Sequence, residues 1–281
     1  MKNILFFALI LFFLQSANAS FDPDARGGKS ASMGFCSVAL NDFWGVFNNQ
    51  ASMAWDAKLN AGIFFENRYL LKEMSTRGFG LIIPATTNDA FGLTFSQYGH
   101  SAYNESKIGL SFAKSFANRV SAGLQFDYLY TSQEIESGKK GIFTFEFGLQ
   151  AKVNNKMMIG FHAFNPIHSK LSNYNDFTEY IPVVLKFGLS YNFSKKFTVI
   201  AETEKNLNNN AIIRGGMEYK INDLLYVRGG LSTGVVLYSF GVGVNWKKFN
   251  FDFGTSTHQV LGVTPSISLN YNFSNLKQKN K

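Results

Sequence analysis

Apolar and polar residues alternate along most of the chain after about residue 59. Within the segment 142–153, the odd positions from Phe143 to Val153 are apolar, whereas the even positions from Thr144 to Lys152 are polar or glycine. Successive side chains of a β-strand point to opposite faces, so this alternation predicts strands with one apolar and one polar face. The predicted strands are 59–68, 76–84, 90–99, 106–115, 119–131, 142–153, 157–164, 182–193, 197–205, 211–221, 224–232, 235–246, 249–257 and 265–273.

The connections between these strands alternate in length. The short ones are 154–156, 194–196, 222–223 and 247–248, and the longer ones are 99–106, 131–141, 165–180 and 255–265. Short periplasmic turns and longer extracellular loops are typical of outer-membrane barrels, and most of the segments match the roughly nine to eleven residues of a tilted membrane strand. The pattern therefore predicts an all-β fold, an antiparallel transmembrane β-barrel of about fourteen strands with both ends in the periplasm.

Charged side chains indicate which face of each strand meets lipid. Lys152, Lys186, Arg214 and Arg228 all fall on the polar faces. A lysine or arginine facing lipid at mid-bilayer costs about 2–4 kcal/mol. We therefore expect the polar faces to line the lumen and the apolar faces to meet the membrane.

Three further segments flank or precede the barrel, which we assign to residues 59–273. Residues 1–19 have the features of a secretory signal: Lys2, an apolar run from Ile4 to Leu14, and Ala17 and Ala19 before the expected cleavage site. Residues 274–281 form a polar tail, which we expect in the periplasm. These features favour the cell outer membrane of a Gram-negative bacterium.

Residues 20–58 do not alternate, and we call them the hatch segment. They carry apolar residues such as Phe35, Val38 and Phe47, but a segment this short does not bury such residues alone. Glycine and small polar residues predicted to face the lumen leave room for it there. We therefore expect the hatch segment to occupy the barrel lumen from the periplasmic side.

Part of the hatch segment also resembles a known family. Ala25–Gly34, Val38-Ala-Leu with Asp42, and Asn49-Gln-Ala51 are similar to the N-terminal signature of the PorV/PorQ family, in which the last element usually reads Asn-Pro-Ala. This resemblance implies a FadL-like barrel of fourteen strands with a lumenal hatch, and a role as an accessory protein of type IX secretion. The hatch residues that we single out are Met33, Gly34, Asp42, Phe43, Trp44, Asn49 and Ala51.

Two functions follow from these features, and the sequence does not separate them. The family resemblance implies that the barrel handles a protein partner of the secretion system. The alternative is FadL-like uptake of a small hydrophobic compound through a lumen gated by the hatch segment. Outer-membrane lipids are expected partners under either function.

Composition and motifs argue against other classes of protein. The formal net charge of +8 is read as a solvated surface and contact with anionic lipid headgroups, because an exported chain rarely meets nucleic acid. Gly230–Gly234 matches G-x-S-x-G, but Ser232 lies between two predicted strands and not before a helix. The four histidines are scattered and the single cysteine is Cys36, so we expect no enzyme, no metal site and no cofactor.

The polar faces contain one charge constellation. Strand pairing across the predicted turns places Glu202 opposite Arg214, and Glu218 close to Arg228. Opposite charges on one sheet face attract by about 0.2–1 kcal/mol per pair. This lumen charge ladder is read as wall stabilisation or as part of a substrate site, and the two readings are not exclusive.

Overall fold

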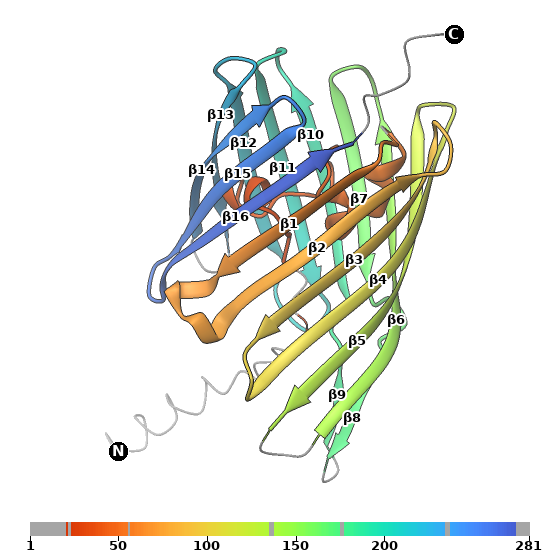
Figure 1. Cartoon of the computed structure of the whole chain (residues 1–281), viewed down its shortest axis with the longest axis vertical. Helices are drawn as coiled ribbons and strands as arrows, with labels where there is room; N and C mark the ends of the chain where they lie inside the picture. The colour runs from red at the N-terminus through yellow and green to blue at the C-terminus, as the bar shows by residue number, and fades with distance from the viewer. Residues whose placement is uncertain are drawn as a thin grey trace, which may run out of the picture.

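A computed structural model describes residues 21, 24–55, 57–134, 138–174, 177–233 and 237–273. Fourteen antiparallel strands close one barrel in these residues, which confirms the predicted fold class (Figure 1). The barrel strands are β1 (Asn60–Asn67), β2 (Ser75–Pro84), β3 (Asp89–Gly99), β4 (Tyr103–Phe116), β5 (Val120–Gln133), β6 (Gly138–Lys152), β7 (Met157–Phe164), β10 (Val184–Asn192), β11 (Phe197–Asn206), β12 (Ile212–Lys220), β13 (Leu225–Ser232), β14 (Leu237–Trp246), β15 (Phe249–His258) and β16 (Gly262–Asn272). The predicted signal peptide (residues 1–19) and polar tail (274–281) lie outside the described residues.

The barrel closes through its first and last strands. Asn60 of β1 lies opposite Asn272 of β16, so the barrel begins and ends at the same end, at the top of Figure 1. The turns at this end are short: residues 117–119 join β4 to β5, and 247–248 join β14 to β15. We call this the short-turn end and the opposite one the loop end.

The connections at the loop end are shorter than predicted. β3 ends at Gly99 and β4 begins at Tyr103, so the expected connection 99–106 is reduced to three residues. The expected connections 131–141 and 255–265 shorten in the same way. Backbone pairing does not require apolar side chains, so the strands continue beyond the residues that alternate. The connection between β7 and β10 stays long and contains the separate hairpin of β8 (Lys170–Tyr174) and β9 (Phe177–Tyr180).

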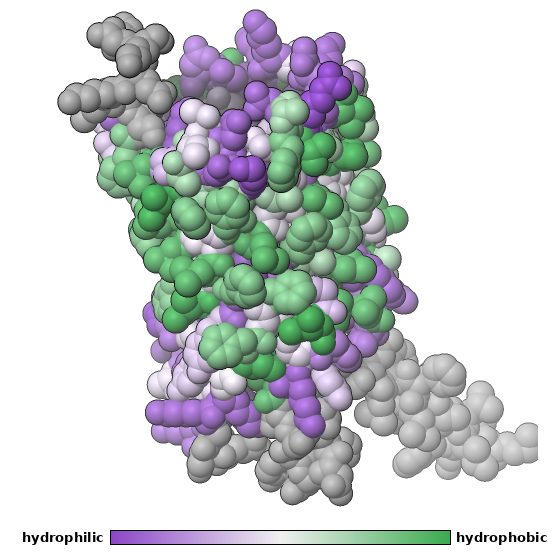
Figure 2. Space-filling view, turned by 90° about the vertical axis from the view of Figure 1, so that its right-hand side faces the viewer, coloured by the Kyte–Doolittle hydropathy of each residue, from purple (hydrophilic) through white to green (hydrophobic). Residues whose placement is uncertain are grey.

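The outer surface carries an apolar band. On the face drawn in Figure 2, this band crosses the middle of the barrel, with hydrophilic residues above and below it. Leu110 and Phe126 point outward with 61% and 63% of their surface exposed, whereas the neighbouring Gln125 points inward and is completely buried. An apolar band between polar rims is the surface of a membrane-spanning barrel, with the faces assigned as predicted.

Helices are short in this fold. Inside the barrel lie α2 (Gly28–Ser32), α3 (Gly45–Asn48) and the 3-10 helix η1 (Gln50–Ala54). Two further 3-10 helices, η2 (Arg68–Leu70) and η3 (Lys72–Met74), form the connection between β1 and β2. None of the helices in the described part of the chain is long and apolar enough to cross a membrane.

Candidate functional site

Residues 24–55 of the hatch segment lie inside the barrel, nearer to its short-turn end (Figure 1). Hydrogen bonds from wall side chains hold this backbone. Ser239 accepts from the amide of Gly34 at 2.7 Å, and Ser268 accepts from the amide of Gly28 at 2.9 Å. These donors have no partner in regular secondary structure, so the wall replaces the water that would otherwise solvate them.

An aromatic cluster packs one side of the hatch segment against the wall. The ring centroid of Trp44 lies 4.9 Å from that of Phe43 and 5.9 Å from that of Phe64 on β1, both in edge-to-face geometry. Phe47 packs on the same Phe64 ring with a centroid distance of 5.3 Å. Phe43 and Trp44 thus bury their rings in the lumen. Packing against the wall replaces the hydrophobic core that a free segment of this length lacks.

On the opposite side, the backbone of the hatch segment approaches the wall at glycines. A Cβ atom added at Gly148 would overlap Oδ1 of Asn49, and one added at Gly160 would overlap the carbonyl oxygen of Val38. The side-chain nitrogen Nδ2 of Asn49 donates to the carbonyl oxygens of Val38 (2.8 Å), Leu149 (3.2 Å) and Phe161 (3.3 Å). Asn49 therefore joins the hatch segment to β6 and β7 at a place where the wall carries no side chain.

The other hatch residues singled out in the sequence are mostly buried as well. Met33 and Gly34 pack against β12 and β13, since a Cβ at Gly216 or Gly230 would meet them. Asp42 is partly exposed towards the short-turn end, where one of its oxygens lies 3.5 Å from Nζ of Lys29. Ala51 is completely buried.

The structure brings the second pair of the charge ladder together. Glu218 lies opposite Arg228 in the β12–β13 register, and Oε2 of Glu218 is 2.6 Å from Nε of Arg228. Asp252 on β15 binds the same guanidinium at 2.6 Å, and Lys29 of the hatch segment lies 3.5 Å from Glu218. The ion-pair group around Arg228 therefore also includes Asp252 and Lys29, which the predicted pairing of two strands did not reveal.

The first pair is in register but makes different contacts. Glu202 lies opposite Arg214, as predicted, yet Arg214 binds Glu204 at 3.2 Å and Asp24 of the hatch segment at 3.3 Å. Oε2 of Glu202 instead accepts the amides of Ser37 (2.7 Å) and Val38 (2.8 Å). The hatch segment thus supplies the partners of Glu202, whereas Arg214 is shared between Glu204 of the neighbouring strand β11 and Asp24 of the hatch segment.

Sequence reasoning missed a buried charge cluster on β4–β7. Lys107 binds Glu146 and lies 3.7 Å from Asp127, and Nε2 of His162 is 2.9 Å from the other oxygen of Glu146. Gln50 of the hatch segment donates to that same oxygen at 2.8 Å. Lys107, Asp127, Glu146 and His162 all fall on the polar faces of their strands. Their position on these faces is the feature of the sequence from which the cluster could have been predicted.

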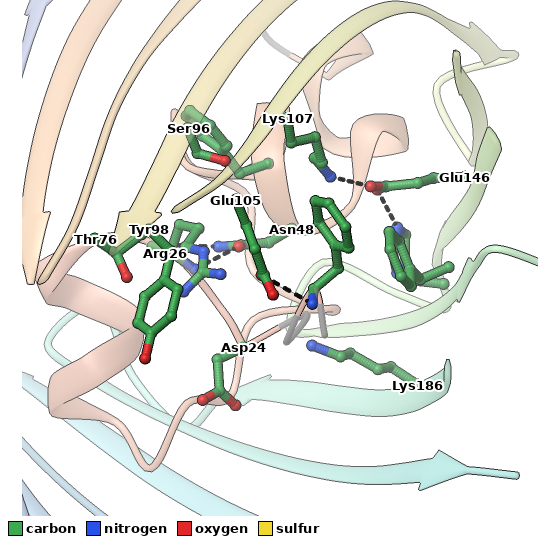
Figure 3. A pocket seen from close by; sticks show the side chains of 14 residues that line it. Asp24, Arg26, Asn48, Thr76, Ser96, Tyr98, Glu105, Lys107, Glu146 and Lys186 are labelled. Carbon is green, nitrogen blue, oxygen red and sulfur yellow. Dashed lines mark hydrogen bonds and ion pairs between the residues drawn. The ribbon is translucent and has the colours of Figure 1, made fainter. Parts of the chain in front are cut away.

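Two cavities lie on either side of the hatch segment. The first has a volume of about 60 Å³ and faces the loop end; Figure 3 shows the side chains around it. Phe21, Phe47 and Phe164 give it an apolar part, and Lys107, Glu146 and Lys186 belong to its polar part. The second, of about 430 Å³, opens at the short-turn end between residues 39–41 and the turn at 154–156.

Solved structures that are similar to this chain include monoaromatic hydrocarbon channels and a toluene transporter. The Pseudomonas putida toluene transporter TodX matches with a TM-score of 0.67 and 11% identity over 90% of this chain and 99% of that one. The CymD monoaromatic hydrocarbon channel matches with 0.68 and 14% over 91% and 100%, and a Pseudomonas aeruginosa FadL homologue with 0.65 and 14% over 88% and 98%. The chain has the FadL-like fold. No family model and no curated protein sequence matches it.

The FadL-like barrel thus agrees with the fold that the PorV/PorQ resemblance implied. Membership of the PorV/PorQ family is not confirmed, because no family model matches the chain. At these low identities the match establishes the fold and leaves the ligand open.

Three further chemical features of the sequence are the G-x-S-x-G match, the potential metal ligands and the single cysteine. Ser232 ends β13 and the next described element is the strand β14, so the G-x-S-x-G match lacks the helix of a nucleophile elbow. No group of three or more potential metal ligands occurs in that part of the chain. Cys36 is buried in the hatch segment, and this burial raises the pKa of its thiol well above the ordinary value.

Proposed function

We propose that the chain is an outer-membrane channel that takes up a small hydrophobic compound through its lumen, with the hatch segment as the gate. The observation that carries this proposal is the separation of two lumenal cavities by the buried hatch segment. Pairing of each strand with both neighbours makes the wall continuous, as in the run from Asp89 to Gly99 of β3 against β4. A compound that enters at the loop end therefore reaches the short-turn end only when the hatch segment moves.

The part of the loop-end cavity that is lined by phenylalanine rings fits a small apolar group. Phe21 and Phe164 belong to a cluster with Leu129, Ile181 and Val184, which continues the apolar part of the cavity into the wall. The charges beside it are compensated within the protein, since Lys107 binds Glu146 and Lys186 lies 3.1 Å from Glu204. A neutral hydrophobic compound leaves these ion pairs intact, whereas an ionic ligand has to compete with them.

Less supports the role in type IX secretion. A protein partner needs an extended docking surface, and specific interfaces bury about 800 Å² on each partner. Several connections at the loop end have only three residues, such as 100–102 and 259–261. The similar solved structures are small-molecule channels, which favours uptake as the function.

Uptake of labelled toluene by a Gram-negative host tests the proposal. Cells that produce the protein should take up toluene faster than cells carrying an empty vector. Ser96 lines the loop-end cavity, so Ser96→Phe should fill it and reduce uptake to the empty-vector rate.

Ser106→Phe is the matched control. Ser106 of β4 lies opposite Gln97, the residue that follows the lumen-facing Ser96. Adjacent residues of a strand point to opposite faces, so Ser106 points to the outer face of the barrel. This variant should keep the wild-type rate at an equal amount of protein in the membrane. Equal uptake by wild-type and empty-vector cells would refute transport of this class of compound.

A further inference from the structure

Two turns at the short-turn end share one arrangement of residues. Phe193-Ser-Lys-Lys-Phe197 joins β10 to β11, and Trp246-Lys-Lys-Phe249 joins β14 to β15. In each, two adjacent lysines stand at the tip of the turn with an aromatic residue on either side. Phe193 and Trp246 are 58% and 56% exposed, so their rings lie on the outside of the barrel.

The aromatic rings form clusters at the edge of the apolar band. Phe193 packs on Tyr191 with a centroid distance of 4.8 Å and on Phe197 at 5.7 Å. In the second turn, Trp246 stacks on Phe249 at 6.3 Å, and Phe249 packs on Tyr271 at 4.6 Å. Aromatic rings of this kind occupy the boundary between hydrocarbon and headgroups in membrane barrels, so each pair of lysines stands at headgroup level.

The whole short-turn end is basic. Its six turns, all within the described residues, carry six basic side chains: Arg119, Lys156, Lys195, Lys196, Lys247 and Lys248. Their one acidic residue, Asp223, is neutralised by Lys220 at 2.7 Å. By contrast, the described connections at the loop end carry Glu73 and Glu134 beside the basic residues Arg68 and Lys72. The positive charge is therefore concentrated at one end of the barrel.

We propose that the two Lys-Lys turns bind the phosphate groups of anionic phospholipids in the leaflet at the short-turn end. An ammonium group donates charge-assisted hydrogen bonds to phosphate, and the adjacent rings and apolar band accommodate the glycerol and acyl chains. The basic side chains are spread over turns around the rim, which fits a surrounding layer of lipid better than a single protein partner. This inference rests on the membrane position of the barrel, which is part of the proposed function, but not on transport.

The tryptophans of the chain provide a direct probe. Of the three, Trp44 is buried in the lumen and Trp55 donates to Gln150 of the inner wall at 2.7 Å. Trp246 alone faces lipid, and Nζ of Lys247 lies 4.9 Å from its ring. Quenching of tryptophan fluorescence by brominated lipids therefore reports on the lipid beside the Lys247–Lys248 turn.

The experiment compares vesicles containing brominated phosphatidylglycerol with vesicles containing brominated phosphatidylcholine at the same mole fraction. The wild-type protein should prefer phosphatidylglycerol about fivefold, and more salt should weaken this preference because it screens exposed charges. Lys247→Gln with Lys248→Gln should remove most of it. Lys139→Gln with Lys140→Gln, a matched change of two charges at the loop end, should leave it unchanged.

Each outcome has a distinct meaning. Equal quenching by the two lipids in the wild-type protein would overturn the headgroup site while leaving the barrel in the membrane. An equal loss of preference in both double variants would overturn the local site, because the net charge alone would then explain it. Absence of quenching by either lipid would contradict the membrane position itself, and with it the proposed function.

Discussion

At the scale of single residues, the hatch segment is held by a few buried polar side chains that serve both it and the wall. Asn49 is completely buried and donates to three carbonyl oxygens, one of the hatch segment and two of the wall. Gln150 on β6 similarly donates to the carbonyl oxygens of Val38 and Leu40, each at 2.9 Å. Loss of such a side chain removes buried hydrogen bonds between the hatch segment and the wall, each worth about 0.5–1.5 kcal/mol.

Cys36 is a natural probe of this attachment. The thiol is buried and its pKa is raised, so a maleimide should react with it slowly at pH 8, when the hatch segment is closed. Asn49→Ala should make local opening easier and speed the labelling of Cys36 by about tenfold or more, which mass spectrometry measures. Asn41→Ala changes an exposed asparagine of the same segment and should react at the wild-type rate. Equal rates for all three proteins would show that Asn49 does not hold the hatch segment.

At the scale of the strand, alternation sets which side chains meet lipid, and position along the strand sets how much a change costs. Phe126 lies in the middle of β5 and Phe116 at the short-turn end of β4, and both point outward. Transfer of a charge to mid-bilayer requires its desolvation, whereas a long side chain at the rim reaches the headgroups.

Phe126→Arg should therefore impair membrane assembly by about 2–4 kcal/mol, whereas Phe116→Arg should cost about 0–1 kcal/mol. Unfolding of each variant by urea in lipid vesicles, followed by heat-modifiable migration on gels, measures the difference. The two variants introduce the same side chain in place of the same residue on adjacent strands, so only depth differs. A larger effect at Phe116 would place the membrane elsewhere on the barrel.

At the scale of the whole molecule, the barrel and the hatch segment are held by different interactions. The wall is closed by hydrogen bonds between strands, which run through every neighbouring pair. The described residues of the hatch segment take part in none of these ladders and pack on the inner face of the wall. The wall is therefore expected to persist without it.

Deletion of residues 30–55 should leave a barrel that still assembles and is protected from protease within the membrane. In a planar bilayer it should conduct ions steadily, because the lumen then holds water, while the full chain should be nearly closed. A variant in which a flexible glycine-serine linker of equal length replaces the same residues separates the loss of packing in the lumen from the shortening of the chain. This variant should also conduct ions. Equal conductance of the full chain and the deletion would show that the hatch segment does not close the lumen.

The sequence by itself determined the strands, their faces and the pairing of neighbours. Period-two alternation is a local property, and short turns set the register between adjacent strands. Glu218 and Arg228 could be placed opposite each other on this basis, and so could Glu202 and Arg214. The same reasoning located the lipid-facing side, since a charge in hydrocarbon is costly wherever the strand lies.

Only the tertiary structure decided which polar groups meet across the lumen. Glu202 binds the amides of Ser37 and Val38, and Glu146 binds Gln50 of the hatch segment and Lys107 two strands away, over sequence separations that no local pattern encodes. Barrel curvature and the path of the hatch segment together set these distances, and neither follows from alternation. Strand pairing is specified between strands that follow each other in the sequence. The partner of a lumen charge instead depends on which chain segment the tertiary structure brings within contact distance of it.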